Sequence, residues 1–299
     1  SMFALEIVLG DFGLATFSPI VISSVAATAV SRYFLGDAPA FIVPGYELIS
    51  AWELPLYVVL GLFCALVGAT FTKVIYSLED LFDGLKFPEY LKAVLGGLIL
   101  GAMALVFPHL LGVGYEAIDL ALMRELSWWL MFLLVLCKIL ATSVTIGSGG
   151  SGGIFAPSLF MGAMAGGFFG TGVHAIFPGM TASPGAYSIV GMGAVVAGAT
   201  HAPITAILII FELTYDYHLI VPLMGACIIS DKIMDAMAGM GEDAMFNTGY
   251  TYAAPEGLDG VLRAGNFGGV DSAPVAADGR PHSIALTLPP LTTLFFELK

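Results

Sequence analysis

Charge is what this sequence has least of. Lys, Arg, Asp and Glu make up 11% of its 299 residues, whereas a soluble domain usually carries about 25% charged residues. Hydrophobic residues make up 58% of the chain, and its mean hydropathy is +0.92. A chain with so few charges cannot cover a water-facing surface with polar groups. We therefore expect lipid to be its main solvent.

Basic residues are the scarcer of the charged residues. The chain has 10 Lys and Arg against 23 Asp and Glu, which gives a formal charge of −13. No basic block suits nucleic acid, so we expect no nucleic-acid partner. The net charge does not exclude anions as cargo, because a narrow pore is governed by the groups within a few ångströms of the ion.

Cysteine is also rare, and the chain shows no pattern typical of a metal site or an active site. The three cysteines, Cys64, Cys137 and Cys227, lie in or near the end of apolar runs, and we expect buried small hydrophobes there. No spacing of His, Cys, Asp and Glu suggests a metal site, and no Ser/His/Asp or Cys/His arrangement suggests a nucleophile. The sequence thus predicts no metal, no cofactor and no enzymatic activity.

Long apolar runs are what the sequence has in abundance. A helix that spans a bilayer needs about 20 mainly apolar residues. Seven stretches qualify as candidates: 18–35, 54–76, 91–111, 128–146, 154–177, 187–213 and 219–234. Pro203 should break the sixth stretch into two shorter helices that meet near His201, and residues 79–84 read as a polar loop. The predicted fold is all-α, a polytopic integral membrane protein.

The last 65 residues differ in character from the rest. Residues 235–299 are richer in Gly, Asp and Pro and contain no further spanning segment, which predicts a water-exposed C-terminal tail. The stretch 272–280 is faintly similar to the strand–turn–strand of a CBS regulatory domain. The alternatives for 235–299 are therefore a flexible tail, which we favour, and a remnant of a CBS-type regulatory region.

The glycine-rich stretch 147–157 (GSGGSGGIFAP) is the most informative part of the chain. It lies between two apolar helices, where irregular backbone is tolerated only if it is buried in protein or lines a wet cavity. The first N–H groups of the following helix have no partners inside that helix and carry a partial positive charge. Glycines let a ligand approach the backbone closely. The pattern predicts an anion site made of backbone dipoles.

Three other interpretations of these glycines compete with an anion site. Gly/Ser runs are usually flexible linkers, but the flanking helices argue against a linker here. A phosphate-binding loop needs Gly-Lys-Ser/Thr, and the stretch has no lysine. Glycines can also serve helix packing, which is the role that we predict for Gly162, Gly166 and Gly170 at four-residue spacing.

Three motifs together carry a family resemblance. They are Gly153-Ile154-Phe155-Ala156-Pro157; Gly191-Met192-Gly193-Ala194 through His201-Ala202-Pro203-Ile204-Thr205-Ala206-Ile207; and Phe211-Glu212-Leu213-Thr214 with Tyr217 and Val221-Pro222-Leu223-Met224. In order and spacing the chain resembles the CLC family of chloride channels and chloride/proton exchangers over about residues 3–234. The resemblance implies that residues 1–234 are a partial CLC transmembrane domain that lacks its N-terminal helices, because the two motifs of the family's first half do not occur in this chain.

The resemblance also implies a ligand and a partner. Chloride would be bound by the backbone amides of Gly153, Ile154, Phe155 and Ala156. The protein would be a homodimer in which each subunit has its own pore, with residues 18–35, 202–215 and 219–234 at the interface. Phe246 would occupy the position of the family's chloride-coordinating tyrosine, without its hydroxyl group.

The same resemblance bears on the choice between channel and exchanger. Glu6 aligns with the first acid of a Phe-x-x-Glu-Glu motif, and Ile7 occupies the position of the exchangers' proton glutamate. An aliphatic residue there favours a voltage-gated-type chloride channel in the cell membrane. The alternatives are a chloride/proton antiporter, with Glu6 on a proton path, and a non-conducting membrane scaffold fragment.

Three polar residues inside apolar runs have two interpretations each. Glu212 is an intramembrane acid, which is a candidate for a functional residue, but we favour a structural role. Lys138 can raise the local positive potential for anions, but we favour a side chain that snorkels or pairs with an acid. His201 can relay protons, but we favour a helix-capping role.

Overall fold

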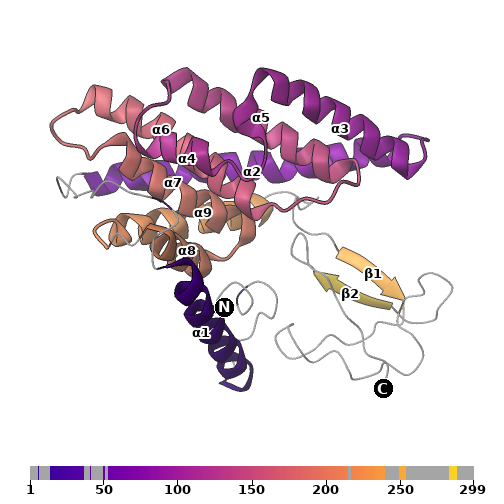
Figure 1. Cartoon of the computed structure of the whole chain (residues 1–299), viewed down its shortest axis with the longest axis horizontal. Helices are drawn as coiled ribbons and strands as arrows, with labels where there is room; N and C mark the ends of the chain where they lie inside the picture. The colour runs from indigo at the N-terminus through magenta and orange to yellow at the C-terminus, as the bar shows by residue number, and fades with distance from the viewer. Residues whose placement is uncertain are drawn as a thin grey trace. The chain divides into compact units, whose positions relative to one another are not determined.

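The computed structural model describes residues 6, 14–36, 41, 50, 53–214, 217–239, 249–253 and 283–287. The chain divides into two compact units. The first unit contains Ser1–Asp37 and Met237–Lys299, and the second contains Ala38–Ala236. The elements of both units are labelled in Figure 1.

The second unit is entirely helical over its described residues. Its elements are α2 (Leu54–Asp83), α3 (Glu89–Val106), the short 3-10 helix η3 (Pro108–Leu110), α4 (Tyr115–Leu122), α5 (Trp128–Gly147), α6 (Phe155–Ile176), α7 (Pro184–Thr200), α8 (Pro203–Thr214) and nearly all of α9 (Ile220–Gly239). The predicted break near His201 is confirmed, since α7 ends at Thr200 and α8 begins at Pro203.

Two details of the sequence prediction were wrong. The acidic residues Glu79, Asp80 and Asp83 do not form a loop, because α2 continues through them to Asp83 and ends before Gly84. The helix α4 was not predicted, since its eight residues include Glu116 and Asp119 and make no long apolar run. Short helices that lie between spans do not carry the composition by which spans are recognised.

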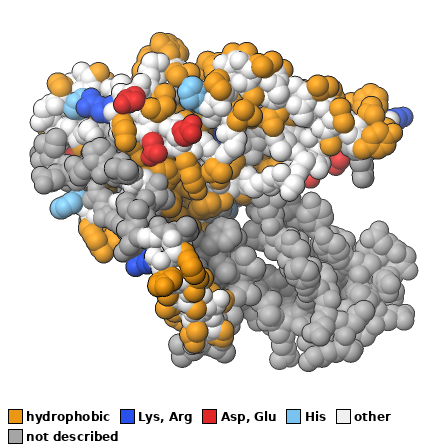
Figure 2. All heavy atoms as spheres, in the orientation of Figure 1, with side chains coloured by type: hydrophobic (Ala, Val, Ile, Leu, Met, Phe, Trp, Pro, Cys, Tyr) orange, Lys and Arg blue, Asp and Glu red, His pale blue; other side chains and the backbone are white. Residues whose placement is uncertain are grey.

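Three helices among the described residues are long and apolar enough to cross a membrane: α2, α5 and α6. The apolar helices α3 and α8 are shorter, and α8, with 12 residues, extends over about 18 Å. Figure 2 shows hydrophobic side chains spread over the visible face of this unit with few charged side chains among them. The composition-based prediction of a polytopic membrane protein is confirmed, although among the described residues fewer segments qualify by length and apolar composition than the seven predicted.

The helix α7 forms the centre of the second unit. All of its side chains from Pro184 to Ala199 are buried, and α6, α2, α8 and α4 pack around it (Figure 1). The closest approach is to α6. A Cβ atom added at Gly166 would overlap the carbonyl oxygen of Tyr187, and one added at Gly191 would lie 2.9 Å from the Cα of Gly166. The predicted packing role of Gly162, Gly166 and Gly170 is confirmed, because all three face the backbone or side chains of α7.

A buried carboxylate joins the start of α2 to the start of α7. Glu53 is fully buried. Its Oε1 accepts hydrogen bonds from the N–H of Ala182 at 2.6 Å, the hydroxyl of Tyr187 at 2.9 Å and the hydroxyl of Tyr57 at 3.3 Å. The rings of Tyr57 and Tyr187 stack with their centroids 4.6 Å apart. One acid therefore satisfies three buried donors from three segments.

The first unit contains α1 (Leu14–Leu35) and two short strands, β1 (Gly249–Ala253) and β2 (Ser283–Thr287). The strands pair in antiparallel register, with Gly249 opposite Thr287. The all-α prediction therefore holds for the second unit, and this strand pair within residues 235–299 is the exception. Residues 272–280, which suggested a CBS-type strand–turn–strand, lie outside the described residues.

Candidate functional site

The first residues of the glycine-rich stretch terminate α5. Gly149 has a left-handed backbone with φ of +81°, and its N–H donates to the carbonyl of Ile146 at 3.0 Å. The N–H of Gly150 donates to the carbonyl of Thr145 at 2.9 Å. These two bonds make a Schellman motif, in which glycine is the residue best suited to the left-handed position. The glycine at position 149 is thus explained by helix termination.

Close packing explains two further glycines of the stretch. A Cβ atom at Gly147 would lie 3.0 Å from the backbone of Leu78 in α2, and one at Gly150 would lie 2.7 Å from the carbonyl oxygen of Thr145. Gly153 is different, because a Cβ atom added there would meet no described atom within 4 Å. The packing of the described chain gives no reason for glycine at position 153.

The stretch ends where α6 begins. Ile154 is the N-cap residue of α6, and its carbonyl accepts hydrogen bonds from the N–H of Ser158 at 2.9 Å and from the hydroxyl of the same serine at 2.7 Å. The predicted site residues Gly153, Ile154, Phe155 and Ala156 therefore all lie at the N-terminal end of α6, where backbone N–H groups give the positive end of the helix dipole.

An open hollow of about 400 Å³ lies beside this helix end. Its walls come from four parts of the second unit: the loop Ser151–Gly153, the first turn of α6 at Ala156 and Pro157, the side of α5 from Lys138 to Ile146, and the segment Leu110–Val113 together with Leu100. Ser151, Gly152 and Gly153 are exposed in the described chain. The start of α6 therefore borders a space large enough for an ion with part of its water shell.

Lys138 supplies the cationic group in the wall of the hollow. Its side chain is buried, and its ammonium group donates to the carbonyl oxygens of Leu110 and Gly112, each at 3.0 Å. The same nitrogen lies 4.8 Å from the centroid of the Phe160 ring. The prediction that Lys138 snorkels or pairs with an acid was therefore wrong for the described structure, because the buried ammonium group donates to carbonyl oxygens instead. These contacts hold the segment after α3 against α5 and fix a positive charge in the wall of the hollow.

The other predicted site residues are not brought to this hollow by the described structure. Phe246 and Ile7 lie outside the described residues. Glu6 belongs to the first unit, so the geometry of the second unit does not test it. Glu212 lies near the end of α8 with an exposed side chain, and its structural role stays a prediction. Cys64 and Cys227 are buried, as expected, and Cys137 is partly buried.

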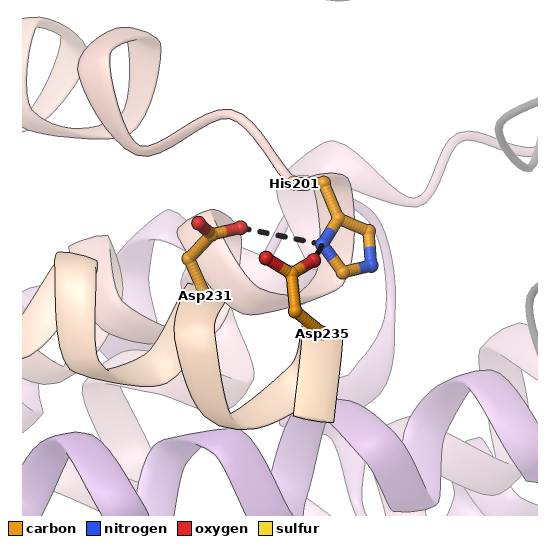
Figure 3. A group of neighbouring side chains, drawn as sticks. All are labelled: His201, Asp231 and Asp235. Carbon is orange, nitrogen blue, oxygen red and sulfur yellow. Dashed lines mark hydrogen bonds and ion pairs between the residues drawn. The ribbon is translucent and has the colours of Figure 1, made fainter. Parts of the chain in front are cut away.

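Sequence reasoning missed one cluster of chemically active side chains. His201, Asp231 and Asp235 lie together at the C-terminal end of α7 and on α9 (Figure 3). His201 is the C-cap residue of α7, which confirms the predicted capping position. The spacing of 30 residues between His201 and Asp231 gave no signal for the cluster, although the four-residue spacing of the two aspartates on one helix was visible.

Comparison with known proteins confirms the resemblance over nearly the same residues. Residues 1–235 match the protein family described as "Voltage gated chloride channel". A putative chloride channel protein, ClcB-like, from Ralstonia nicotianae is 39% identical over 228 residues, which cover 76% of this chain and 53% of that protein. The H(+)/Cl(−) exchange transporter ClcA of Yersinia pestis is 31% identical, over 76% of this chain and 48% of that protein.

Solved structures share the fold. A slow cyanobacterial Cl−/H+ antiporter aligns with a TM-score of 0.63 and 29% identity, over 72% of this chain and 51% of that chain. A CLC-type fluoride/proton antiporter aligns with a TM-score of 0.66 and 19% identity, over 79% of this chain and 57% of that chain. The chain spans about half the length of the curated relatives ClcB-like and ClcA.

Proposed function

The chain belongs to the voltage gated chloride channel family, and from this premise we propose that it contributes a chloride-binding site to a protein that moves chloride across a cell membrane. The observation that carries the proposal is the open space at Gly153, where the first turn of α6 borders the hollow. The described packing does not require glycine at position 153. A glycine there does, however, let a ligand approach the backbone closely.

The chemistry of the proposed step is an exchange of ligands around the ion. Chloride loses part of its water shell, and the backbone N–H groups of residues 153–156, at the start of α6, replace the lost water molecules. The fixed ammonium group of Lys138 adds a positive potential in the same wall. Dipoles hold an anion more weakly than a direct ion pair, so the ion can also leave, as conduction requires. No covalent step, enzyme chemistry or cofactor is part of this proposal.

We propose passive, channel-type conduction first, because an aliphatic residue, Ile7, stands at the position of the exchangers' proton glutamate. The second candidate is chloride/proton exchange, in which Glu6 would lie on the proton path. The named activities of ClcA and of the cyanobacterial antiporter favour this candidate. Recording pH during chloride efflux from liposomes distinguishes the two. Proton movement in a fixed ratio to chloride would rule out the channel.

A homodimer in the lipid bilayer is the assembly that we propose. The helices α8 and α9 expose apolar side chains, among them Ile204, Leu208, Met224 and Ile228, and the resemblance to the family places these helices at a subunit interface. Light scattering of the purified chain in detergent measures the assembly directly. A folded dimer without any chloride efflux would favour the scaffold alternative over transport.

The decisive experiment removes one backbone N–H group. Ile154→Pro keeps the carbonyl that accepts from Ser158 but deletes the N–H, and proline is well tolerated at the start of a helix. The matched control Ile154→Ala keeps the N–H. A hydrogen bond to a charged group contributes about 1.5–3 kcal/mol, so Ile154→Pro should weaken chloride binding in calorimetry by about tenfold or more relative to Ile154→Ala, and should lower efflux from liposomes.

A second variant controls for misfolding of Ile154→Pro. The methyl group of Gly153→Ala meets no described atom within 4 Å, so this variant should keep the melting temperature of the wild type while weakening chloride binding. Equal chloride affinity in Ile154→Pro and Ile154→Ala, together with wild-type affinity in Gly153→Ala, would refute the backbone-amide site.

A further inference from the structure

The cluster of His201, Asp231 and Asp235 connects the C-terminal end of α7 to the side of α9, far in sequence from the glycine-rich stretch. His201 directly follows α7 in a left-handed conformation with φ of +52°. The two aspartates lie four residues apart on α9 and therefore share one helix face. Figure 3 shows the imidazole ring and both carboxylates pointing toward one another across the gap between α7 and α9.

The distances within the cluster fit three ligands of one cation. The Nδ1 atom of His201 lies 3.2 Å from Oδ1 of Asp231 and 3.2 Å from Oδ1 of Asp235, and candidate ligand atoms of all three residues lie within 4.8 Å of one another. Two donor atoms that are each about 2.1 Å from a zinc ion, at an angle of about 100°, lie about 3.2 Å apart. A single Nδ1–H group, in contrast, has one proton for two carboxylates.

The electrostatics of the cluster also favour a cation. Lys232 pairs with the outer oxygens, at 2.8 Å from Oδ2 of Asp235 and 3.6 Å from Oδ2 of Asp231. Both Oδ1 atoms are left to face His201. With a neutral imidazole, two carboxylates and one ammonium group leave one net negative charge. The C-terminal end of α7, with its partial negative charge, lies at the same place.

Accessibility differs between the two carboxylates in a way that suits an exchangeable ion. The side chain of Asp231 is 9% exposed, whereas that of Asp235 is 49% exposed. Burial holds the carboxylate of Asp231 in place, whereas the exposure of Asp235 leaves a path by which an ion can enter from solvent. Water can complete the coordination on the open side, as it does in zinc sites with three protein ligands.

We propose that His201, Asp231 and Asp235 form a binding site for a divalent transition-metal ion of the Zn²⁺ type. The ligands are Nδ1 of the histidine and one oxygen of each carboxylate. A bound ion ties the break between α7 and α8 to α9, so it restrains the relative movement of these helices. This site was not expected from the sequence, which predicted no metal, and it is independent of the proposed chloride site.

The test is a zinc titration of the purified 299-residue chain in detergent, followed by calorimetry and thermal unfolding. We expect about one strong site per chain and a melting temperature that rises with zinc. His201→Gln and Asp235→Asn should each weaken zinc binding by at least about tenfold. Lys232→Gln should tighten it, because the ammonium group competes with the ion for both carboxylates. The control His218→Gln changes an exposed histidine outside the cluster and should bind zinc as the wild type does.

Two results would overturn the proposal. One is the absence of any zinc-dependent rise in the melting temperature of the wild type. The other is zinc binding that survives in both His201→Gln and Asp235→Asn. If a protonated imidazole bridging two carboxylates is the whole role of the cluster, zinc will not bind and Lys232→Gln will not create binding. Because Asp235 is half exposed, Asp235→Asn should fold even if a change at the buried Asp231 does not.

Discussion

Replacing Gly166 with alanine places a methyl group where α6 meets α7. The added Cβ atom would overlap the carbonyl oxygen of Tyr187 and would lie 2.8 Å from its carbonyl carbon and 2.9 Å from the Cα of Ser188. Carbon atoms in contact normally lie about 3.5–4.0 Å apart, so the helices must separate by roughly 1 Å. The obstacle is backbone, which cannot rotate away, and α7 is enclosed on its other sides.

The expected cost follows from two opposing effects. Overpacking a close contact costs about 1–3 kcal/mol and occasionally more. The higher helix propensity of alanine returns up to about 1 kcal/mol. Gly172 lies on the same helix, and a Cβ atom added there meets no described atom within 4 Å, so Gly172→Ala isolates the propensity effect. Gly166→Ala should therefore lower the free energy of unfolding by about 1–3 kcal/mol relative to Gly172→Ala.

The assay is equilibrium unfolding of both variants in detergent micelles, monitored by tryptophan fluorescence, with circular dichroism to confirm that both are helical at the start. Both variants add one methyl group to α6, so hydrophobicity and chain length are matched. If Gly166→Ala is as stable as Gly172→Ala, the close approach of α6 and α7 is wrong, and the order of the two helices in the core must be revised.

Two further predictions concern buried polar groups. Glu53→Leu should destabilise the fold by about 3–5 kcal/mol in the same unfolding assay, because three buried donors lose their acceptor. Glu53→Gln keeps a carbonyl acceptor and should cost clearly less. Equal losses of stability in the two variants would contradict the hydrogen-bonding role of Glu53. Lys138→Met should cost about 1–3 kcal/mol because the carbonyls of Leu110 and Gly112 lose their donor, while Lys86→Met, at an exposed loop position, should be neutral. A neutral Lys138→Met would show that the ammonium group does not hold the segment after α3.

The sequence predicted the parts of the fold that depend on local composition. Long apolar runs gave α2, α5 and α6, and Pro203 gave the break between α7 and α8, since a proline cannot continue a helix from its N-terminal side. The start of α6 was also predictable, because a glycine-rich stretch followed by Ile154 changes the character of the chain within a few residues.

The parts that were missed depend on contacts between distant residues. Glu53 lies at the edge of an apolar run, and its donors Ala182 and Tyr187 follow more than a hundred residues later. The pairing of His201 with Asp231 depends on how α9 packs beside the end of α7. No local pattern encodes such neighbours, so a single sequence read by periodicity cannot find them.

The enclosure of α7 has a consequence for how the protein responds to its surroundings. A helix whose side chains are all covered by other helices offers no surface to acyl chains. A change in bilayer thickness or headgroup composition must therefore act first on the exposed faces of α2, α3, α5, α8 and α9. The α6–α7 pair should be the part of the molecule that a different host membrane perturbs least.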